Sequence, residues 1–529
     1  MQSFDAVIVG AGFAGMYMLH KMRGMGLSAQ VIERGAGVGG TWYWNRYPGA
    51  RVDIESRDYG YSFDPELEKE WRWSERFAAQ PELLKYLNHV ADRYDLRRDI
   101  SFETTVTAAH FDEEAGRWQI QTDKGEALHA RYCIMATGCL SEPKVLMFPG
   151  KDDFRGESYC TFDWPEEGVD FTGKRVGIIG TGSSGIQTIT TIAPECGHLT
   201  IFQRTPNYSV PAQNHPLSHE EQAEWAPFQK AWRERAKSQP LGFWNEPTMA
   251  MALATAPEDR EIEFERRWAA GGFRVGAPYA DVGVDLEANR TVADFVARKI
   301  SGIVKDPEVA DRLTPKTYPF ATKRLCVDTG YYEVFNRDNV TLVDIRETPI
   351  EAITATGVRT TGQDYPLDAI IYATGFDAMT GTLAKIDIRG RGGLPLAEKW
   401  ADGPVTYLGL MVAGFPNLFT ITGPGSPSVL TNMVMSIEQH VDFIADAIEH
   451  MQARQMAVIE ATEEGEAAWV HHVAEVADMT LYPLADSWYM GANVPGKPRV
   501  FLPYVGGFQA YKDACNDAVV NGYRGFAFG

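Results

Sequence analysis

The sequence has no paired cysteines, no long apolar run and no excess of positive charge, and each absence excludes a class of protein. Its cysteines form no CxxC pair, which argues against a disulfide framework and favours a reducing cytoplasm; they are Cys133, Cys139, Cys160, Cys196, Cys326 and Cys515. No apolar stretch approaches the roughly 20 residues that a membrane-spanning helix needs. The N-terminus lacks the basic and apolar regions of a signal peptide. We therefore expect a cytoplasmic protein without a membrane partner.

Negative charge dominates the composition. Asp and Glu number 71 against 50 Lys and Arg, so the net charge is −21. Such a surface repels nucleic acid and anionic membranes, and any anionic ligand must be held by a local cluster of basic residues. At 529 residues, with 44% hydrophobic and 23% charged residues, the chain is typical of a globular enzyme with two or three domains. No metal site is expected.

The first 33 residues contain the pattern of a dinucleotide-binding fold. The apolar run 4–9 predicts a buried parallel strand, and Gly10, Gly12 and Gly15 follow it as GxGxxG before a helix. These glycines permit a tight turn and bring backbone N–H groups close to a pyrophosphate. The next strand ends at Glu33, 23 residues after Gly10, where a carboxylate can bind a ribose diol. A glycine turn without a nucleotide is the alternative, but the order of strand, glycines, helix, strand and acid favours the nucleotide.

The same pattern returns with one change. A strand at 175–179 is followed by a second glycine motif, formed by Gly180, Thr181, Gly182, Ser183, Ser184 and Gly185. Gln203 lies 23 residues after Gly180, where the first motif has its acid, and Arg204 and Thr205 follow. A carboxylate would repel a 2′-phosphate, whereas a guanidinium binds it. The first site is therefore predicted to bind FAD and the second NADPH, although Arg204 alone is also compatible with an ordinary surface charge.

The predicted fold is α/β, with two Rossmann-like dinucleotide-binding domains and a helical insertion that covers a cleft. Strands that end in Ala-Thr-Gly, at 136–138 and 373–375, are typical of the crossings between such domains in two-dinucleotide flavoproteins. Between them lies a charge-rich segment with helical periodicity, and a long amphipathic helix is expected at 435–451. The predicted boundaries are 1–139 and 382–529 for the FAD-binding domain, 140–210 and 322–381 for the NADPH-binding domain, and 211–321 for the insertion.

Three segments resemble the Baeyer–Villiger monooxygenases, and together with the rest of the pattern the resemblance covers nearly the whole chain. Residues 39–53, GGTWYWNRYPGARVD, match the family's glycines, tryptophan, aromatic-Pro-Gly and final aspartate. Residues 322–340 carry the adjacent Lys323 and Arg324. Residues 154–165, FRGESYCTFDWP, match the family fingerprint at Phe154, Gly156, Trp164 and Pro165. Cys160 stands where the family has histidine, so either weaker coupling between the domains or a mere packing role is expected there.

The resemblance implies that the chain uses FAD, NADPH and O2 to convert a ketone to an ester or lactone through a flavin C4a-peroxide, with sulfoxidation possible. It makes Arg324 the cation that stabilises the negatively charged oxygen adduct and Asp53 the carboxylate that orients it. Lys323 points the other way in an extended segment and would address the 2′-phosphate together with Arg204. Without the resemblance, a solvated basic pair and a turn aspartate explain these residues equally well.

The resemblance also assigns further binding residues. Gly40, Thr41 and Trp42, together with Asp53, are expected at the cofactor. Trp488 is expected on a mobile loop that closes over bound NADP, with a surface tryptophan of no role as the alternative. The substrate-lining residues are expected to be apolar, as a ketone pocket requires; they are Val429, Leu430 and Met433.

Three rival functions differ in what they require. A flavin monooxygenase that oxygenates nitrogen or sulfur shares both glycine motifs but does not need Arg324 opposite Asp53. A disulfide reductase needs a redox cysteine pair, which the sequence lacks. A redox sensor that holds FAD and NADPH without turnover would have no need of Arg324 and Asp53. The partners expected for the preferred reading are a small ketone and O2, and the expected assembly is a monomer or a weak homo-oligomer.

Overall fold

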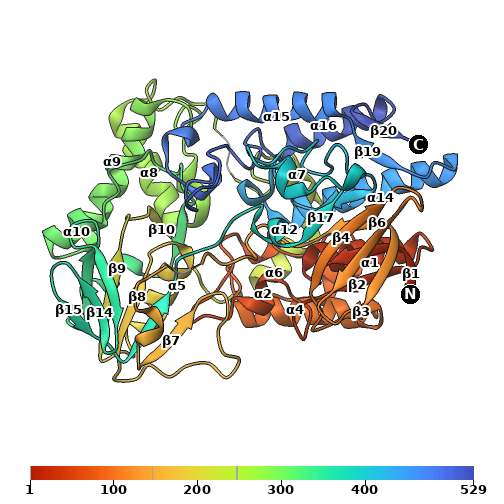
Figure 1. Ribbon diagram of the computed structural model, residues 1–529. Coiled ribbons are helices and arrows are strands. Elements are labelled where there is room, and N and C mark those ends of the chain that lie inside the picture. The colour runs from red at the N-terminus through yellow and green to blue at the C-terminus, as the bar shows by residue number, and fades with distance from the viewer. Residues whose placement is uncertain (1, 146, 246–247) are drawn as a thin grey trace.

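The first large sheet carries the N-terminal glycine motif. The structure, a computed structural model, describes residues 2–145, 147–245 and 248–529 (Figure 1). The strand order is β17-β4-β5-β6-β1-β2-β3, and β18 also pairs with β6. β1 runs parallel to both β2 and β6, as the mostly apolar run at residues 4–9 predicts. The strands are β1 (Gln2–Val9), β2 (Ala29–Ile32), β3 (Ile100–Ser101), β4 (Val106–Asp112), β5 (Arg117–Thr122), β6 (Ala127–Met135), β17 (Asp387–Arg389) and β18 (Leu418–Thr420).

Helices cover one face of this sheet. Ile8 and Val31 point to the helical side, where α1 packs against α14, and Val7 and Val9 point to the opposite side. The alternation follows from the two-residue period of a strand. The helices of this part are α1 (Phe13–Gly24), α2 (Thr41–Trp44), α3 (Pro65–Glu70), α4 (Gln80–Arg93), α12 (Gly381–Lys385), α13 (Leu396–Lys399), α14 (Met433–Arg454), α15 (Glu463–Asp478) and α16 (Phe508–Val520). β19 (Ile459–Ala461) pairs antiparallel with β20 (Phe526–Phe528) in a separate two-stranded sheet.

The second large sheet carries the second glycine motif, and its strands are all parallel in the order β12-β9-β8-β16-β7. Its helices α5 (Ser183–Ile192) and α11 (Tyr331–Val334) pack against each other. A three-stranded antiparallel sheet shares an apolar cluster with the other face. The strands are β7 (Glu157–Cys160), β8 (Arg175–Ile179), β9 (His198–Gln203), β12 (Val340–Asp344) and β16 (Ala369–Tyr372), and those of the small sheet are β13 (Ile350–Thr354), β14 (Gly357–Thr360) and β15 (Asp364–Pro366).

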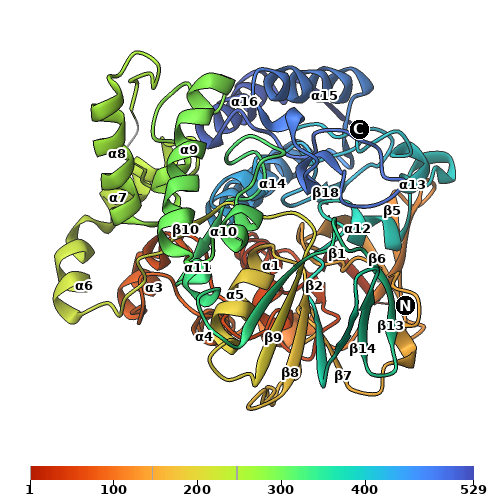
Figure 2. The same cartoon turned by 90° about the vertical axis from the view of Figure 1, so that its left-hand side faces the viewer.

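The charge-rich middle segment is helical. Figure 2 shows α7, α8 and α9 grouped on one side of the molecule, away from β13 and β14. The segment lies between two short strands that pair in parallel, β10 (Ser209–Pro211) and β11 (Cys326–Asp328), so its two ends meet. Asp285 caps α9 by accepting hydrogen bonds from the N–H groups of Glu287 and Ala288. The helices are α6 (His219–Trp225), α7 (Gln229–Lys237), α8 (Pro257–Ala270), α9 (Leu286–Ile303) and α10 (Pro307–Leu313).

Within the described ranges, none of the helices has the length and apolar character of a membrane-spanning segment. The six cysteines are free, and all but the half-buried Cys160 are buried.

Candidate functional site

The first glycine motif forms a tight turn at the start of α1. Gly10 has a φ of +105°, and a Cβ on it would lie 2.6 Å from the carbonyl oxygen of Ala136, the first residue of an Ala-Thr-Gly turn. A Cβ on Gly15 would lie 1.8 Å from the oxygen of Gly10, so only glycine fits either position. Gly12 caps α1 with no side-chain hydrogen bond, which leaves the N–H groups of the first turn available to an anion. This geometry fits a pyrophosphate.

Glu33 and the segment 40–42 border the same turn. The carboxylate of Glu33 is buried and accepts hydrogen bonds from the N–H groups of Ala11 at 2.7 Å and Gly35 at 2.6 Å. Burial raises its pKa, although these two bonds act in the opposite direction. Gly40 faces Gly12, and a Cβ on Gly40 would lie 2.9 Å from the Cα of Gly12. Thr41 and Trp42 then begin α2 beside the glycine turn.

The second glycine motif repeats this construction at the start of α5. Gly180 has a φ of +113°, and a Cβ on it would lie 2.3 Å from the carbonyl oxygen of Ala373, in the second Ala-Thr-Gly turn. A Cβ on Gly182 would meet nothing within 4 Å, so space remains in front of the helix. Gly182 caps α5 without a side-chain bond, and Ser183, Ser184 and Gly185 form its first turn. Each Ala-Thr-Gly turn thus packs behind its own glycine motif.

Arg204, Lys323 and Lys144 lie near one another beyond the end of β9. Arg204 is exposed, while Lys323 and Lys144 are half-buried. Burial and then the charge of Arg204 lower the pKa of both lysines. Lys323 also lies 4.6 Å from the ring of Tyr318. In the described part of the chain, no ion pair is found for Arg204 or Lys144, and the acid that acts on Lys323 is Asp486, so positive charge is in excess here in a protein of net charge −21.

Gln203 and Thr205 flank this cluster. Gln203, at the position of the missing acid, is fully buried and donates to the carbonyl of Arg312 at 2.9 Å. No carboxylate therefore occupies that position to repel a phosphate. The carbonyl of Thr205 accepts a hydrogen bond from the hydroxyl of Thr181 at 3.3 Å, which joins the end of β9 to the glycine motif.

Arg324 and Asp53 form an ion pair that joins residues 271 positions apart. One carboxylate oxygen of Asp53 accepts from Nε of Arg324 at 3.0 Å and from Nη2 at 2.6 Å, while Nη1 donates to the carbonyl of Val429 at 2.8 Å. The side chains are 29% and 24% exposed. Burial alone would lower the pKa of Arg324, but Asp53 and the nearby Tyr489 raise it above its ordinary value. Arg324 therefore stays cationic at any physiological pH.

The predicted substrate residues lie in one apolar cluster beside this pair. Val429 is buried in it, and Leu430, Met433 and Trp488 pack against its edge. Trp488 begins a short 3₁₀ turn, Trp488–Met490, and its ring centroid lies 4.2 Å from that of Tyr489. The cluster connects the ion pair to the loop that carries Trp488.

Three residues near the site have no signal in the sequence motifs. Lys144 lies in the connection between the sheets, and its N–H donates to the carbonyl of Gly375. Tyr489 is buried and interacts with Arg324. Phe273, from the helical segment, has its ring 4.9 Å from the guanidinium carbon of Arg324. The position of each depends on packing between segments far apart in the chain, and the aromatic run at Trp488 is the nearest local hint for Tyr489.

The fingerprint segment lies on the second sheet. Cys160 ends β7 opposite Tyr372, and burial raises the pKa of its thiol to about 11. A Cβ on Gly156 would lie 2.5 Å from the carbonyl oxygen of Asp368, so the fingerprint glycine permits its backbone to pack closely against that of Asp368. A cavity of about 320 Å³ separates part of this segment from α2; it is lined by Tyr43, Trp44, Arg46, Asp163, Trp164, Pro165 and Glu166. Tyr43 and Trp44 therefore border the same cavity as the end of the fingerprint segment.

Two glycine motifs, each backed by an Ala-Thr-Gly turn, define a two-dinucleotide oxidoreductase. In agreement, residues 7–221 match the family model described as pyridine nucleotide-disulphide oxidoreductase. A Baeyer–Villiger monooxygenase of Pseudooceanicola batsensis is 46% identical over 526 residues, covering 98% of this chain and 95% of that protein. The chain belongs to the Baeyer–Villiger monooxygenases, a family of flavin monooxygenases.

Solved structures agree with this membership. An oxidised steroid monooxygenase bound to NADP superposes with a TM-score of 0.96 at 50% identity, covering 100% of this chain and 99% of the other. The monooxygenase OTEMO in complex with FAD and NADP superposes with a TM-score of 0.96 at 40% identity, covering 99% of each chain.

Proposed function

We propose that this chain oxidises ketones to esters or lactones with NADPH and O2, using bound FAD. The observation that carries the proposal is the Arg324–Asp53 pair, a cation held by a carboxylate and a backbone carbonyl beside an apolar cluster. When bound, NADPH supplies the reducing equivalents and FAD the activation of oxygen. Residues of this protein would bind the two cofactors, stabilise the negative charge and exclude water.

The residues around the first glycine motif suit FAD. The uncapped first turn of α1, with Gly10, Gly12 and Gly15, would hold the pyrophosphate, and Glu33 would accept from a ribose hydroxyl through its remaining lone pairs. Residues 40–42 adjoin this turn and would contact the same cofactor.

The residues around the second motif suit NADPH. The turn 180–185 would hold the pyrophosphate, and Arg204 and Thr205 would address the 2′-phosphate. Lys323 and Lys144 add two positive charges at the same place. A dianionic group is the natural partner of such a cluster, because the cations otherwise repel one another.

Arg324 would stabilise the negative charge that develops on oxygen when the ketone carbonyl is attacked. Its guanidinium remains protonated and offers several directed N–H groups. Asp53 would orient it and offset the cost of partial burial. Val429, Leu430 and Met433 would exclude water and accept the apolar part of the ketone, and Trp488 would close the edge of that cluster over NADP.

The domain division predicted from the sequence is proposed here as well. The supporting observation is strand membership: β17 and β18 lie in the first sheet, whereas β12 and β16 lie in the second. The pairing of β10 with β11 brackets the proposed insertion, residues 211–321. We also propose a cytoplasmic location, which the six free cysteines support.

A product assay tests the proposed function. NADPH oxidation is measured with linear, cyclic, aromatic and steroidal ketones, and the products are identified by mass spectrometry. A tertiary amine and a thioether are run in parallel. An ester or lactone from at least one ketone supports the proposal. Amine or sulfur oxides without any ester would overturn it in favour of an N- or S-oxygenating enzyme.

A further inference from the structure

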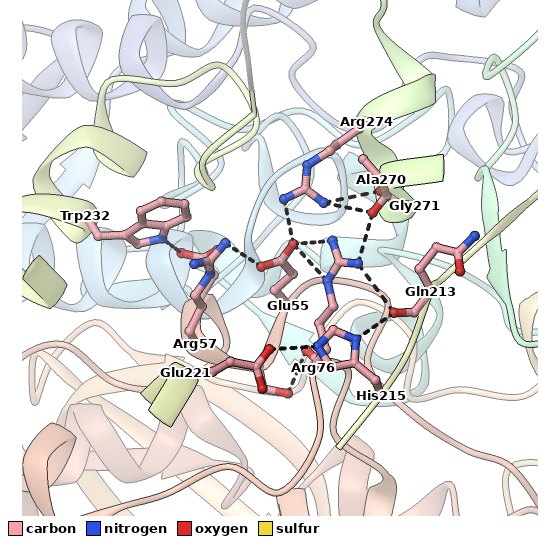
Figure 3. A network of polar contacts seen from close by, with 12 residues as sticks. Glu55, Arg57, Arg76, Gln213, His215, Glu221, Trp232, Ala270, Gly271 and Arg274 are labelled. Carbon is pink, nitrogen blue, oxygen red and sulfur yellow. Dashed lines mark hydrogen bonds and ion pairs between the residues drawn. The ribbon is translucent and has the colours of Figure 1, made fainter. Parts of the chain in front are cut away.

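A single carboxylate, Glu55, lies at the centre of three arginines near the proposed active site (Figure 3). One of its oxygens accepts from Nη2 of Arg76 at 2.7 Å and from Nη2 of Arg274 at 2.8 Å, and the other lies 2.6 Å from Nη2 of Arg57. The four side chains are between 14% and 23% exposed. Burial alone would raise the pKa of Glu55, but the arginines lower it to about 2. This cluster therefore stays ionised throughout the physiological range.

Arg76 and Arg274 connect the C-terminal end of α8 to the segment that carries Glu55 through hydrogen bonds. Arg76 donates to the carbonyl of Ala270 at 2.9 Å, and Arg274 lies 3.4 Å from the same oxygen and 3.3 Å from that of Gly271. Cations at a helix C-terminus satisfy its last carbonyls and complement its dipole. The cluster therefore fixes where the chain leaves α8.

The third arginine connects the cluster to α7. The guanidinium of Arg57 lies 3.8 Å from the ring centroid of Trp232, and the indole N–H of Trp232 donates to Asp58 at 2.7 Å. Two helices of the proposed insertion are thus held against residues 55–58 by one charged centre.

Two residues of this cluster are close in sequence to residues that contact Arg324. Glu55 follows Asp53 by two positions, and Arg274 directly follows Phe273, whose ring lies beneath the guanidinium of Arg324. Gly271 and Gly272 have φ values of +72° and +66°, so the chain turns sharply before Phe273. Glu55 and Arg274 therefore lie within two residues of Asp53 and Phe273, both of which contact Arg324.

We propose that Glu55 and Arg274 are positioning residues, which act through Phe273 to keep Arg324 in the orientation that Asp53 sets. The proposal rests on the proposed function of Arg324. Phe273 is the residue beside Arg274 that contacts Arg324, whereas the hydrogen bonds of Arg274 itself go to Glu55 and to two carbonyls of the α8 terminus. Loss of the anchor would let the 3₁₀ turn Gly272–Gly276 shift, and small misplacements of catalytic groups lower rates by large factors.

The test uses the FAD-loaded enzyme and the variant Arg274→Gln. This change leaves Glu55 paired with Arg57 and Arg76, whereas removal of Glu55 would leave three partly buried cations without their carboxylate and endanger folding. We expect the share of oxidised NADPH that ends in ester to fall about tenfold, while the rate of flavin reduction changes less than twofold. Arg298→Gln is the matched control, because it removes a surface ion pair to Glu261 within the same helical segment.

A double variant tests whether the effect passes through Phe273. If Arg274 acts in this way, Arg274→Gln lowers the ester yield no further in a Phe273→Ala background. Hydrogen–deuterium exchange of residues 270–276 provides a readout independent of turnover, and it should accelerate in Arg274→Gln but not in Arg298→Gln. Additive losses in the double variant, or faster exchange with a wild-type ester yield, would overturn the proposal. Failure of the wild-type enzyme to make any ester would instead contradict the proposed function.

Discussion

The cluster of Lys144, Arg204 and Lys323 allows a quantitative prediction about cofactor choice. Replacement of Lys144 with Gln removes one positive charge beside the proposed 2′-phosphate site and keeps a side chain of similar length. NAD+ lacks that phosphate, so the substitution should weaken the binding of NADP+ and leave the binding of NAD+ unchanged.

The size of the effect follows from Coulomb's law. Two unit charges about 5 Å apart interact by about 3 kcal/mol at an effective dielectric constant of about 20. Lys144 is only half-buried, so solvent screening reduces this to about 1–1.5 kcal/mol. That corresponds to a roughly tenfold rise in the Kd for NADP+.

Calorimetric titration of the oxidised, FAD-loaded enzyme with NADP+ and with NAD+ measures the effect. Lys85→Gln, a change of the same charge at an exposed position on α4, is the control. The difference between variant and wild type should shrink at 0.5 M salt, because the Debye length is about 10 Å at 0.1 M and shorter above it. A Kd for NADP+ within twofold of wild type, or an equal loss for both nucleotides, would refute the assignment of Lys144.

Two further predictions concern charge and stability. Asp53→Asn keeps an oxygen that can accept hydrogen bonds from Arg324 but removes the negative charge. Because the pair is about one-quarter exposed, we expect the rate of ester formation to fall roughly tenfold. The rate is measured as product per minute, and the FAD content of the variant should be unchanged. Burial lowers the pKa of His440 from 6.5 to about 3, so the unfolded chain binds a proton that the folded one does not, and stability falls as the pH drops below 6.5. Between pH 7.5 and pH 5 this amounts to about 2 kcal/mol in urea unfolding. His440→Asn, which keeps an acceptor for the Thr422 N–H, should remove that part of the pH dependence, and an unaltered dependence would contradict it.

The elements around both glycine motifs could be predicted because their signals are local. The run at residues 4–9 and the glycines after it determine a strand and a turn within about 15 residues, and β1 and α1 lie where the pattern indicates. The strand predicted at 175–179 coincides with β8, and the amphipathic pattern at 435–451 falls within α14. Helical periodicity likewise predicted α7 to α10.

The assembly of the site could not be predicted in this way. Arg324 and Asp53 were paired through the family resemblance alone, because no local pattern joins residues 271 positions apart. Lys144 and Phe273 acquire their significance only when the connection between the sheets and the end of α8 fold beside other segments. The network around Glu55 has the same origin in part, since Arg274 joins it from 219 positions along the chain.

The central claim is that a permanently cationic Arg324 stabilises the negative charge formed on oxygen during the attack on a ketone. The most direct measurement compares Arg324→Ala with wild type in two steps, the reduction of bound FAD by NADPH and the formation of ester from a ketone. Loss of a charged donor to an oxyanion should lower ester formation about 100-fold or more, while flavin reduction stays within a few-fold of wild type and hydrogen peroxide replaces the ester. Ester formation by Arg324→Ala at the wild-type rate would contradict the account.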